Sequence, residues 1–127
     1  MKNIIHIEPT DNSPKIILNA DDGLIEFEGK SYPENTFSFY KPVLEWLEDY
    51  FENIQDKTVV NFKLTYFNSA TTQVIFDILD IIQEYNHEDI EIYWFFDEDN
   101  ESALEDFEDY KEEFPQLNIK PVVLQKA

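Results

Sequence analysis

Apolar and polar residues alternate along several short segments of the chain, and they recur every three or four residues along three longer segments. Alternation is typical of a β-strand with one buried face, whereas the longer spacing is typical of an amphipathic helix. The pattern predicts strands over residues 3–7, 15–18, 24–28, 58–67, 90–96 and around Pro121, and helices over residues 36–54, 69–86 and from Ser102 onward. The predicted order is therefore three strands followed by helices and strands in alternation.

The first three strands are short and precede any helix. Within residues 24–28, Ile25 and Phe27 alternate with two glutamates, which predicts one buried face and one solvent-exposed face. The tripeptide Asp21-Asp22-Gly23 separates this strand from the one before it, and glycine readily adopts the positive φ of a hairpin turn. We therefore expect the first three strands to pair antiparallel.

Each predicted helix carries an apolar face that we expect to pack on the sheet, because its apolar residues recur with helical spacing. The residues predicted to face the core are Phe37, Tyr40, Leu44, Leu47, Phe51 and Ile54 in the first helix, Val74, Ile75, Ile78, Ile81, Ile82 and Tyr85 in the second, and Leu104, Phe107, Tyr110 and Phe114 in the third. We also expect Trp94 to lie in or beside this core.

Strands that alternate with helices form crossovers that are right-handed in nearly all proteins and that join parallel neighbours. Proline cannot donate a backbone hydrogen bond, so Pro121 predicts that the last strand lies at a sheet edge. The sequence therefore predicts an α/β fold, with a mixed sheet of five or six strands and three helices packed on it. The length of 127 residues is that of one domain, and we assign residues 1–127 to it.

The chain is strongly acidic, with 28 Asp and Glu residues against 9 Lys and Arg residues and a formal net charge of −19. This charge repels phosphate backbones and anionic lipid headgroups, so we expect neither nucleic acid nor a membrane as a partner. The apolar content of 43% is enough for an ordinary core at this length. Stability therefore requires no cofactor, and we predict none.

The sequence contains no cysteine, which excludes disulfides, thiolate metal sites and cysteine nucleophiles. No segment approaches the ~20 apolar residues of a membrane span, and the amino-terminal apolar stretch is shorter than the ~7 to 15 residues of a signal-peptide core. We therefore predict a cytoplasmic protein. His6 and His87 have no serine or cysteine partner that the sequence can place, and we predict no enzymatic activity.

Two short motifs are similar to ligand sites, but both depart from the required pattern. Five residues separate Gly23 from the sequence Gly29-Lys30-Ser31 where a phosphate-binding P-loop has four, and those five alternate as a strand. Acidic residues between Asp97 and Glu108 follow the register of a calcium-binding EF-hand loop, but Ser102 occupies the position that requires glycine. We expect a charged first helical turn at the second motif.

The pentapeptide Ser31-Tyr32-Pro33-Glu34-Asn35 precedes the first helix and permits two interpretations. Ser31 and Glu34 have the spacing of a capping box, Pro33 suits a first helical turn, and Asn35 is itself a good N-cap. In the second interpretation, Tyr32, Pro33, Glu34 and Asn35 form an exposed rim that binds a partner.

The segment Tyr66-Phe67-Asn68-Ser69-Ala70-Thr71-Thr72 places three hydroxyl groups in the first turn of the second helix. Asn68 is the expected N-cap, and in the simplest interpretation the hydroxyls only cap and fill this turn. A helix N-terminus also stabilises a phosphate through its free N–H groups and its dipole, so Ser69 can carry a phosphate without unfolding the domain. Thr71 and Thr72 are the alternative acceptors, and we expect Thr71 to lie nearer the exposed turn.

These two segments, together with Ile5-His6-Ile7-Glu8-Pro9-Thr10, Leu44-Glu45-Trp46-Leu47 and Phe62-Lys63-Leu64, resemble the SiaC family of bacterial regulatory phosphoproteins. The resemblance covers nearly the whole chain and implies a fold like the STAS domains of anti-sigma-factor antagonists. It also implies a switch protein that a serine/threonine kinase phosphorylates and a PP2C-type phosphatase restores, with Ser69 at the family's phosphoacceptor position. In the best-known members, the unphosphorylated form binds and activates a diguanylate cyclase, which raises cyclic di-GMP.

We therefore predict a non-enzymatic binding protein that docks a partner, such as a diguanylate cyclase, only while Ser69 is unmodified. The predicted partner-binding residues are Tyr32, Pro33, Glu34, Asn35, Tyr66, Asn68 and Ser69. One alternative is an acidic decoy that mimics nucleic acid and occupies a basic protein's groove, which the net charge alone would support. Another is a carboxylate-based metal-binding protein or metalloenzyme.

Overall fold

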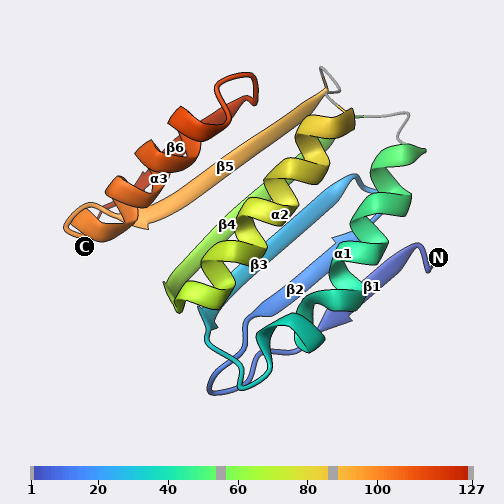
Figure 1. Cartoon of the computed structure of the whole chain (residues 1–127), viewed down its shortest axis with the longest axis horizontal. Coiled ribbons are helices and arrows are strands. Elements are labelled where there is room, and N and C mark those ends of the chain that lie inside the picture. Colours follow the sequence, from blue (N-terminus) through green and yellow to red (C-terminus); the bar gives the residue numbers. More distant parts are fainter. Residues whose placement is uncertain (1, 54–56, 86–88, 126–127) are drawn as a thin grey trace.

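The structure, a computed structural model, describes residues 2–53, 57–85 and 89–125 (Figure 1). The described residues form six strands and three helices in the predicted order. Their bounds are β1 (Ile4–Ile7), β2 (Lys15–Asn19), β3 (Leu24–Ser31), α1 (Thr36–Glu52), β4 (Thr58–Phe67), α2 (Ser69–Tyr85), β5 (Ile90–Asp97), α3 (Glu101–Glu113) and β6 (Ile119–Leu124). The predicted helix ends at Ile54 and Asn86 lie outside the described residues, as does His87.

The described strands form one six-stranded mixed sheet in the order β1-β2-β3-β4-β5-β6. β1, β2 and β3 pair antiparallel, and the pairs from β3 to β6 are parallel, as predicted. Pro121 lies on β6 opposite Trp94 of β5, and β6 forms one edge of the sheet. The predicted fold class and the edge position of the proline strand are both confirmed.

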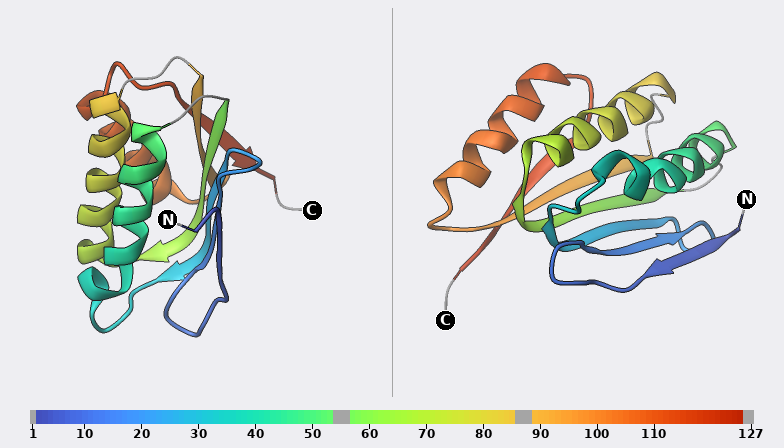
Figure 2. Two further views of the ribbon diagram at one scale, coloured as in Figure 1. Left: turned by 90° about the vertical axis from the view of Figure 1, so that its right-hand side faces the viewer. Right: turned by 60° about the horizontal axis from the view of Figure 1, so that its bottom comes forward.

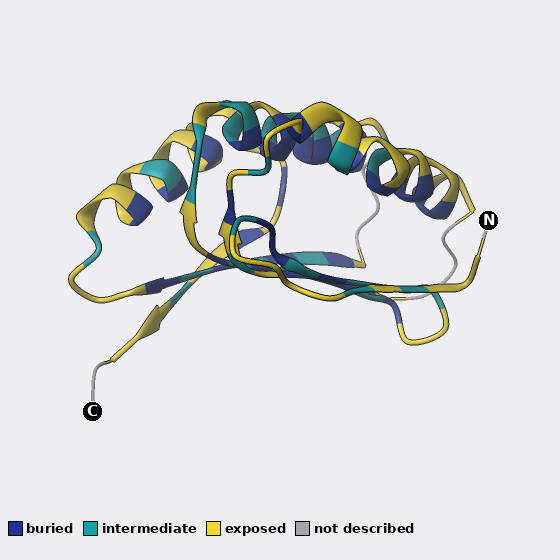
Figure 3. Cartoon of the chain, turned by 90° about the horizontal axis from the view of Figure 1, so that it is seen from below, coloured by how far each residue is buried: buried dark blue, intermediate teal, exposed yellow. Residues whose placement is uncertain are grey.

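All three helices pack on one face of the sheet, and the other face is open (Figures 2 and 3). Each parallel strand is added on the same side of the strand before it, so the right-handed crossovers place every helix on the same face. The core fills the space between the two layers. Its largest fully buried side chains are Tyr40, Phe27, Phe51, Phe62, Ile16, Leu18, Ile25, Leu47, Ile75, Ile78, Leu79 and Ile82.

Trp94 is buried in this core, as predicted. Its ring centroid lies 5.6 Å from that of Phe62 and 5.2 Å from that of Tyr110, so it packs against both β4 and α3. The indole Nε1 donates a hydrogen bond to the carbonyl oxygen of Ala103 at 3.1 Å. A large apolar ring with a satisfied polar atom thus joins β5 to α3.

Two residues that the periodicity predicts to face the core are exposed instead. Phe37 is 55% exposed and Leu104 is 40% exposed. The buried face of α1 runs through Thr36 and Tyr40, and successive helical residues differ by about 100° around the axis, so Phe37 lies to one side of that face. On α3 the buried residue is Ala103, in phase with Phe107, Tyr110 and Phe114, and Leu104 is one position out of phase.

Two glycines have the positive φ that most other residues avoid. Gly23 has φ of 66° in the β2–β3 turn, where an added Cβ would lie 2.3 Å from the carbonyl oxygen of Lys57. Gly29 has φ of 112° within β3, at a point where the register against β4 shifts and leaves Thr65 without an opposite residue. The residues between Gly23 and Ser31, which are similar to a P-loop in sequence, therefore form strand β3.

Candidate docking surface around Ser69

β3 and β4 end side by side, and this brings the two sequence segments of interest together. Ser31, the last residue of β3, pairs with Phe67, the last residue of β4. The backbone N–H of Asn68 then donates to the carbonyl oxygen of Ser31 at 3.1 Å. The loop over residues 32–35 and the start of α2 therefore leave the sheet at the same place, since parallel strands end at the same edge.

Asn68 caps α2, as predicted. Its side-chain Oδ1 accepts a hydrogen bond from the backbone N–H of Thr71 at 2.8 Å, and its carbonyl oxygen accepts from the N–H of Thr72 at 3.0 Å. Ser69 is the first residue of α2 and is exposed. Its hydroxyl group thus stands at the positive end of the helix dipole, where a negative charge is favourable.

The two threonines that follow differ from Ser69 in accessibility. Thr71 is 1% exposed, and its hydroxyl donates to the carbonyl oxygen of Ser31 at 3.0 Å, so the expectation that it lies nearer the exposed turn is wrong. Thr72 is half-buried, and its hydroxyl donates to the carbonyl oxygen of Asn68 at 3.3 Å. Of the three hydroxyl groups, that of Ser69 is the most accessible to a kinase.

Two exposed tyrosines from different segments meet beside Ser69. Tyr32 is 38% exposed and Tyr66 is 57% exposed, and their rings pack edge to face with centroids 5.5 Å apart. The hydroxyl of Tyr32 donates to the carbonyl oxygen of Asp11 at 3.0 Å, and its backbone N–H donates to that of Asn12 at 2.8 Å. These bonds fix the loop against the β1–β2 connection, so the aromatic pair is held in place before any partner arrives.

The remaining predicted rim residues directly precede α1. The side chain of Asn35 accepts from the N–H of Ser38 at 3.3 Å, so Asn35 is the N-cap. Ser31 is buried at the end of β3, which excludes a capping box between it and Glu34. Pro33 is half-buried, whereas Glu34 and Asn35 are exposed.

A buried hydroxyl network supports this surface from behind. The Ser31 Oγ lies 2.6 Å from the Tyr40 hydroxyl and 2.9 Å from the Thr71 Oγ1, which ties β3, α1 and α2 together. Burial raises the pKa of Tyr40 to about 12, although the hydrogen bond with Ser31 lowers it. The sequence does not predict this network, because 40 positions separate Ser31 from Thr71.

Phe37 is a surface residue, although the helical spacing predicts that it faces the core. It lies two residues after the Tyr32–Asn35 loop and lines a hollow of about 350 Å³ with Ser38, Lys41 and Leu44. Phe37 therefore adds an exposed phenyl ring at the start of α1.

On its other side, Ser69 borders a groove of about 500 Å³ between the starts of α2 and α3. Thr72 lines the groove from α2, and Asn100, Ser102 and Asp106 line it from the α3 side. Burial raises the pKa of Asp106, and the neighbouring carboxylates of α3 raise it further. The groove therefore combines polar and apolar side chains with one carboxylate, that of Asp106.

The other candidate chemistry is scattered. Among the described residues, no group of three or more His, Asp or Glu side chains is placed to hold a metal ion. His6 is half exposed on β1, with Nε2 3.4 Å from a carboxylate oxygen of Glu8. No helix in the described part of the chain is long and apolar enough to cross a membrane.

These observations define a two-layer α/β domain that presents an exposed serine and exposed aromatic rings at the carboxyl ends of its parallel strands. The family model for the SiaC family regulatory phosphoproteins matches residues 7–124, so the chain belongs to that family. An uncharacterised protein from Pseudomonas aeruginosa (strain UCBPP-PA14) is 28% identical over 111 residues, which are 86% of this chain and 88% of that protein.

Two solved structures from P. aeruginosa have closely similar folds. Apo-SiaC superposes with a TM-score of 0.81 at 24% identity, covering 97% of this chain and 98% of that chain. A crystal structure of the diguanylate cyclase SiaD in complex with its activator SiaC contains a chain with a TM-score of 0.83 at 25% identity, covering 96% of this chain and 99% of that chain.

Proposed function

We propose that this protein is a non-enzymatic, cytoplasmic switch that activates a diguanylate cyclase while Ser69 is unmodified. A serine/threonine kinase would phosphorylate Ser69, and a PP2C-type phosphatase would restore it. The observation that carries the proposal is the position of Ser69, which is exposed at the first residue of α2 beside the Tyr32–Tyr66 pair. The family membership and the SiaD–SiaC complex support the choice of partner.

The local electrostatics favour a phosphate that leaves the fold intact. The first backbone N–H groups of a helix have no partner within the helix, and the dipole adds positive potential at that end. A phosphoserine carries a charge of about −1.5 to −2 at pH 7, which this position stabilises. We therefore expect the phosphorylated domain to keep its structure.

The effect of the phosphate is then exerted on the partner. Docking would bury Tyr66, Tyr32 and the start of α2, and a dianion at that place would have to lose its water. Repulsion from any acidic group on the partner adds to this cost, and like charges across an interface cost several kcal/mol. Phosphorylation would therefore release the cyclase.

Substitutions at Ser69 test the switch. With the diguanylate cyclase encoded in the same genome, we expect Ser69→Ala to bind and to activate cyclic di-GMP synthesis, and Ser69→Asp to fold normally and to do neither. Gln116→Asp is the matched control, because Gln116 is exposed in the α3–β6 connection at the opposite end of the parallel strands. Full activation by Ser69→Asp, or loss of activation by Gln116→Asp, would contradict the proposal.

Neutral variants of α3 separate the switch from an acidic decoy. Glu108 and Glu112 are exposed on α3. If the acidic surface itself were the binding site, the double variant Glu108→Gln, Glu112→Gln would bind the partner more weakly. If Ser69 controls docking, as we propose, this double variant should bind the partner as the wild type does.

A further inference from the structure

β4 and β5 separate before they end. Their pairing runs from Thr58 opposite Ile90 to Phe62 opposite Trp94, although β4 continues to Phe67 and β5 to Asp97. On either side of this gap the sheet continues, since β3 pairs with β4 as far as Phe67 and β5 pairs with β6 as far as Asp97. The main-chain N–H and C=O groups that face this gap therefore have no ladder partner across it.

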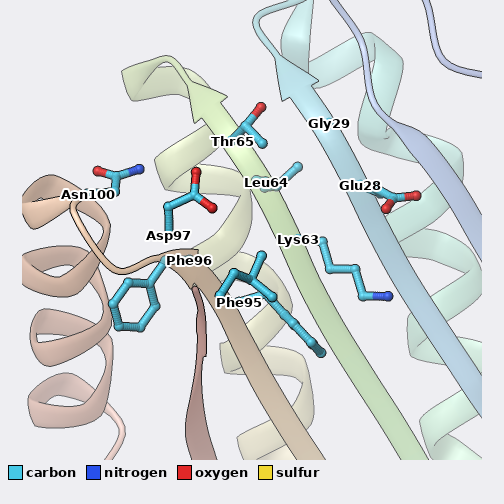
Figure 4. A pocket seen from close by; sticks show the side chains of 10 residues that line it. Glu28, Gly29, Lys63, Leu64, Thr65, Phe95, Phe96, Asp97 and Asn100 are labelled. Carbon is cyan, nitrogen blue, oxygen red and sulfur yellow. The ribbon is translucent and has the colours of Figure 1, made fainter. Parts of the chain in front are cut away.

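A cavity of about 340 Å³ occupies this gap on the open face of the sheet (Figure 4). This volume falls within the ~300 to 1,000 Å³ typical of ligand sites. Leu64, Thr65 and Asn100 line both this cavity and the groove beside Ser69. The cavity therefore adjoins the proposed docking surface.

The polar groups of the cavity favour a cation. The Asp97 carboxylate stands between the ends of β4 and β5 in Figure 4, and the ion pairs found among the described residues do not include it. Lys63 also lines the cavity, but its Nζ is directed towards β3, where it lies 2.8 Å from a carboxylate oxygen of Glu26. Glu28 is the other carboxylate in the lining, and it lies 3.9 Å from the Nζ of Lys15, so a cation that enters the cavity would meet Asp97 as the unpaired carboxylate.

The apolar groups of the cavity suit an aliphatic stem. Leu64, Phe95 and Leu124 line it, and Leu124 is 45% exposed at the edge strand. Lysine and arginine combine an aliphatic stem with a charged head, and both bury the stem on apolar surface while the head keeps polar contacts.

We propose that the β4–β5 cavity binds a lysine or arginine side chain on a segment of the protein partner, with the charged head at Asp97. The proposal rests on the proposed function, because the segment belongs to the partner that docks around Ser69. Charge complementarity between the Asp97 carboxylate and a basic side chain is the reason for this choice of occupant.

Nuclear magnetic resonance tests the site without the partner. N-acetyl-argininamide is the probe, and N-acetyl-citrullinamide is its neutral analogue of nearly the same shape. We expect the arginine probe to shift the amide signals of Thr65, Phe95 and Asp97 in a saturable way, with an affinity about tenfold higher than that of the citrulline probe. Asp97→Asn should remove this difference, whereas Glu108→Gln, which removes the same charge from an exposed position on α3, should keep it.

Equal affinities for the two probes would overturn the proposal, as would shifts confined to α3 amides or an unchanged preference in Asp97→Asn. These outcomes are separate from those of the Ser69 variants, because the probe requires neither phosphorylation nor a cyclase. If the arginine probe binds as predicted but Ser69→Asp still activates the cyclase, the cavity proposal would stand and the proposed switch would be wrong.

Discussion

Three hydroxyl groups from Ser31, Tyr40 and Thr71 meet behind the exposed serine, where β3, α1 and α2 come together. Buried polar groups are costly unless they are hydrogen-bonded, and here each hydroxyl has a partner. The network holds the cap of α2 against the end of β3. The buried hydroxyl network thus positions Ser69, the residue that the proposed kinase would modify.

The raised pKa of Tyr40 predicts a loss of stability at alkaline pH. The ordinary pKa of tyrosine is 10.0, and burial raises that of Tyr40 to about 12 in the folded protein. The neutral phenol is therefore favoured in the folded state, so its contribution is complete below pH 10 and is lost as the pH rises from 10 towards 12.

Tyr40→Phe should be less stable than the wild type by ~1 kcal/mol at pH 7, because one buried hydrogen bond is removed. Urea titrations at several pH values should show this difference shrinking above pH 10, because only the wild type loses the contribution of Tyr40 there. The other tyrosines are present in both proteins, so their ionisation does not change the difference. Stability curves that fall in parallel would contradict the assignment.

At the scale of the elements, the apolar faces of the helices decide which residues matter to stability. Leu47 on α1 and Ile78 on α2 are fully buried. Phe37 on α1 and Leu104 on α3 also lie on amphipathic helices, but their side chains are exposed. All four residues are large and apolar, so we expect their contributions to stability to differ because of burial and not because of residue type.

Leu47→Ala and Ile78→Ala should each lower the free energy of unfolding by ~2 to 5 kcal/mol, because each leaves a cavity in the core. Phe37→Ala and Leu104→Ala are the matched controls and should change it by less than ~0.5 kcal/mol. Chemical denaturation measures all four variants, and a large loss in either control would show that the helix faces are assigned wrongly.

Much of the element pattern could be predicted because period-two and helical spacing are local properties. The order of elements, the antiparallel start of the sheet and the edge position of Pro121 all followed from such signals. The exposed Phe37 was missed because spacing alone does not give the angle of a helix relative to the sheet. The Ser31–Thr71 contact and the gap between β4 and β5 depend on residues far apart in the chain, which one sequence cannot bring together.

At the scale of the whole molecule, charge is distributed unevenly between the two layers. The three helices carry 14 acidic residues against Lys41 and Lys111. On the open face, lysines are paired with carboxylates, as in Lys63 with Glu26 and Lys57 with Glu91. The repulsion is therefore concentrated in the helix layer.

Added salt should stabilise the domain. The net charge is −19, and screening becomes effective as the Debye length falls to ~10 Å at 0.1 M ionic strength. We expect the melting temperature to rise with sodium chloride, and to rise less in the double variant Glu108→Gln, Glu112→Gln. A melting temperature that does not change with salt would contradict the view that repulsion between carboxylates destabilises the domain.

We propose that a phosphate on Ser69 releases the partner from an intact domain. The most direct measurement is a calorimetric titration of the diguanylate cyclase with the unmodified and the phosphorylated protein, after mass spectrometry has located the phosphate. We predict phosphate on Ser69, an unchanged circular dichroism spectrum and an affinity at least about tenfold weaker, or ~1.4 kcal/mol. Phosphate on neither Ser69, Thr71 nor Thr72 would contradict the site, and equal affinities with Ser69 fully phosphorylated would contradict the mechanism.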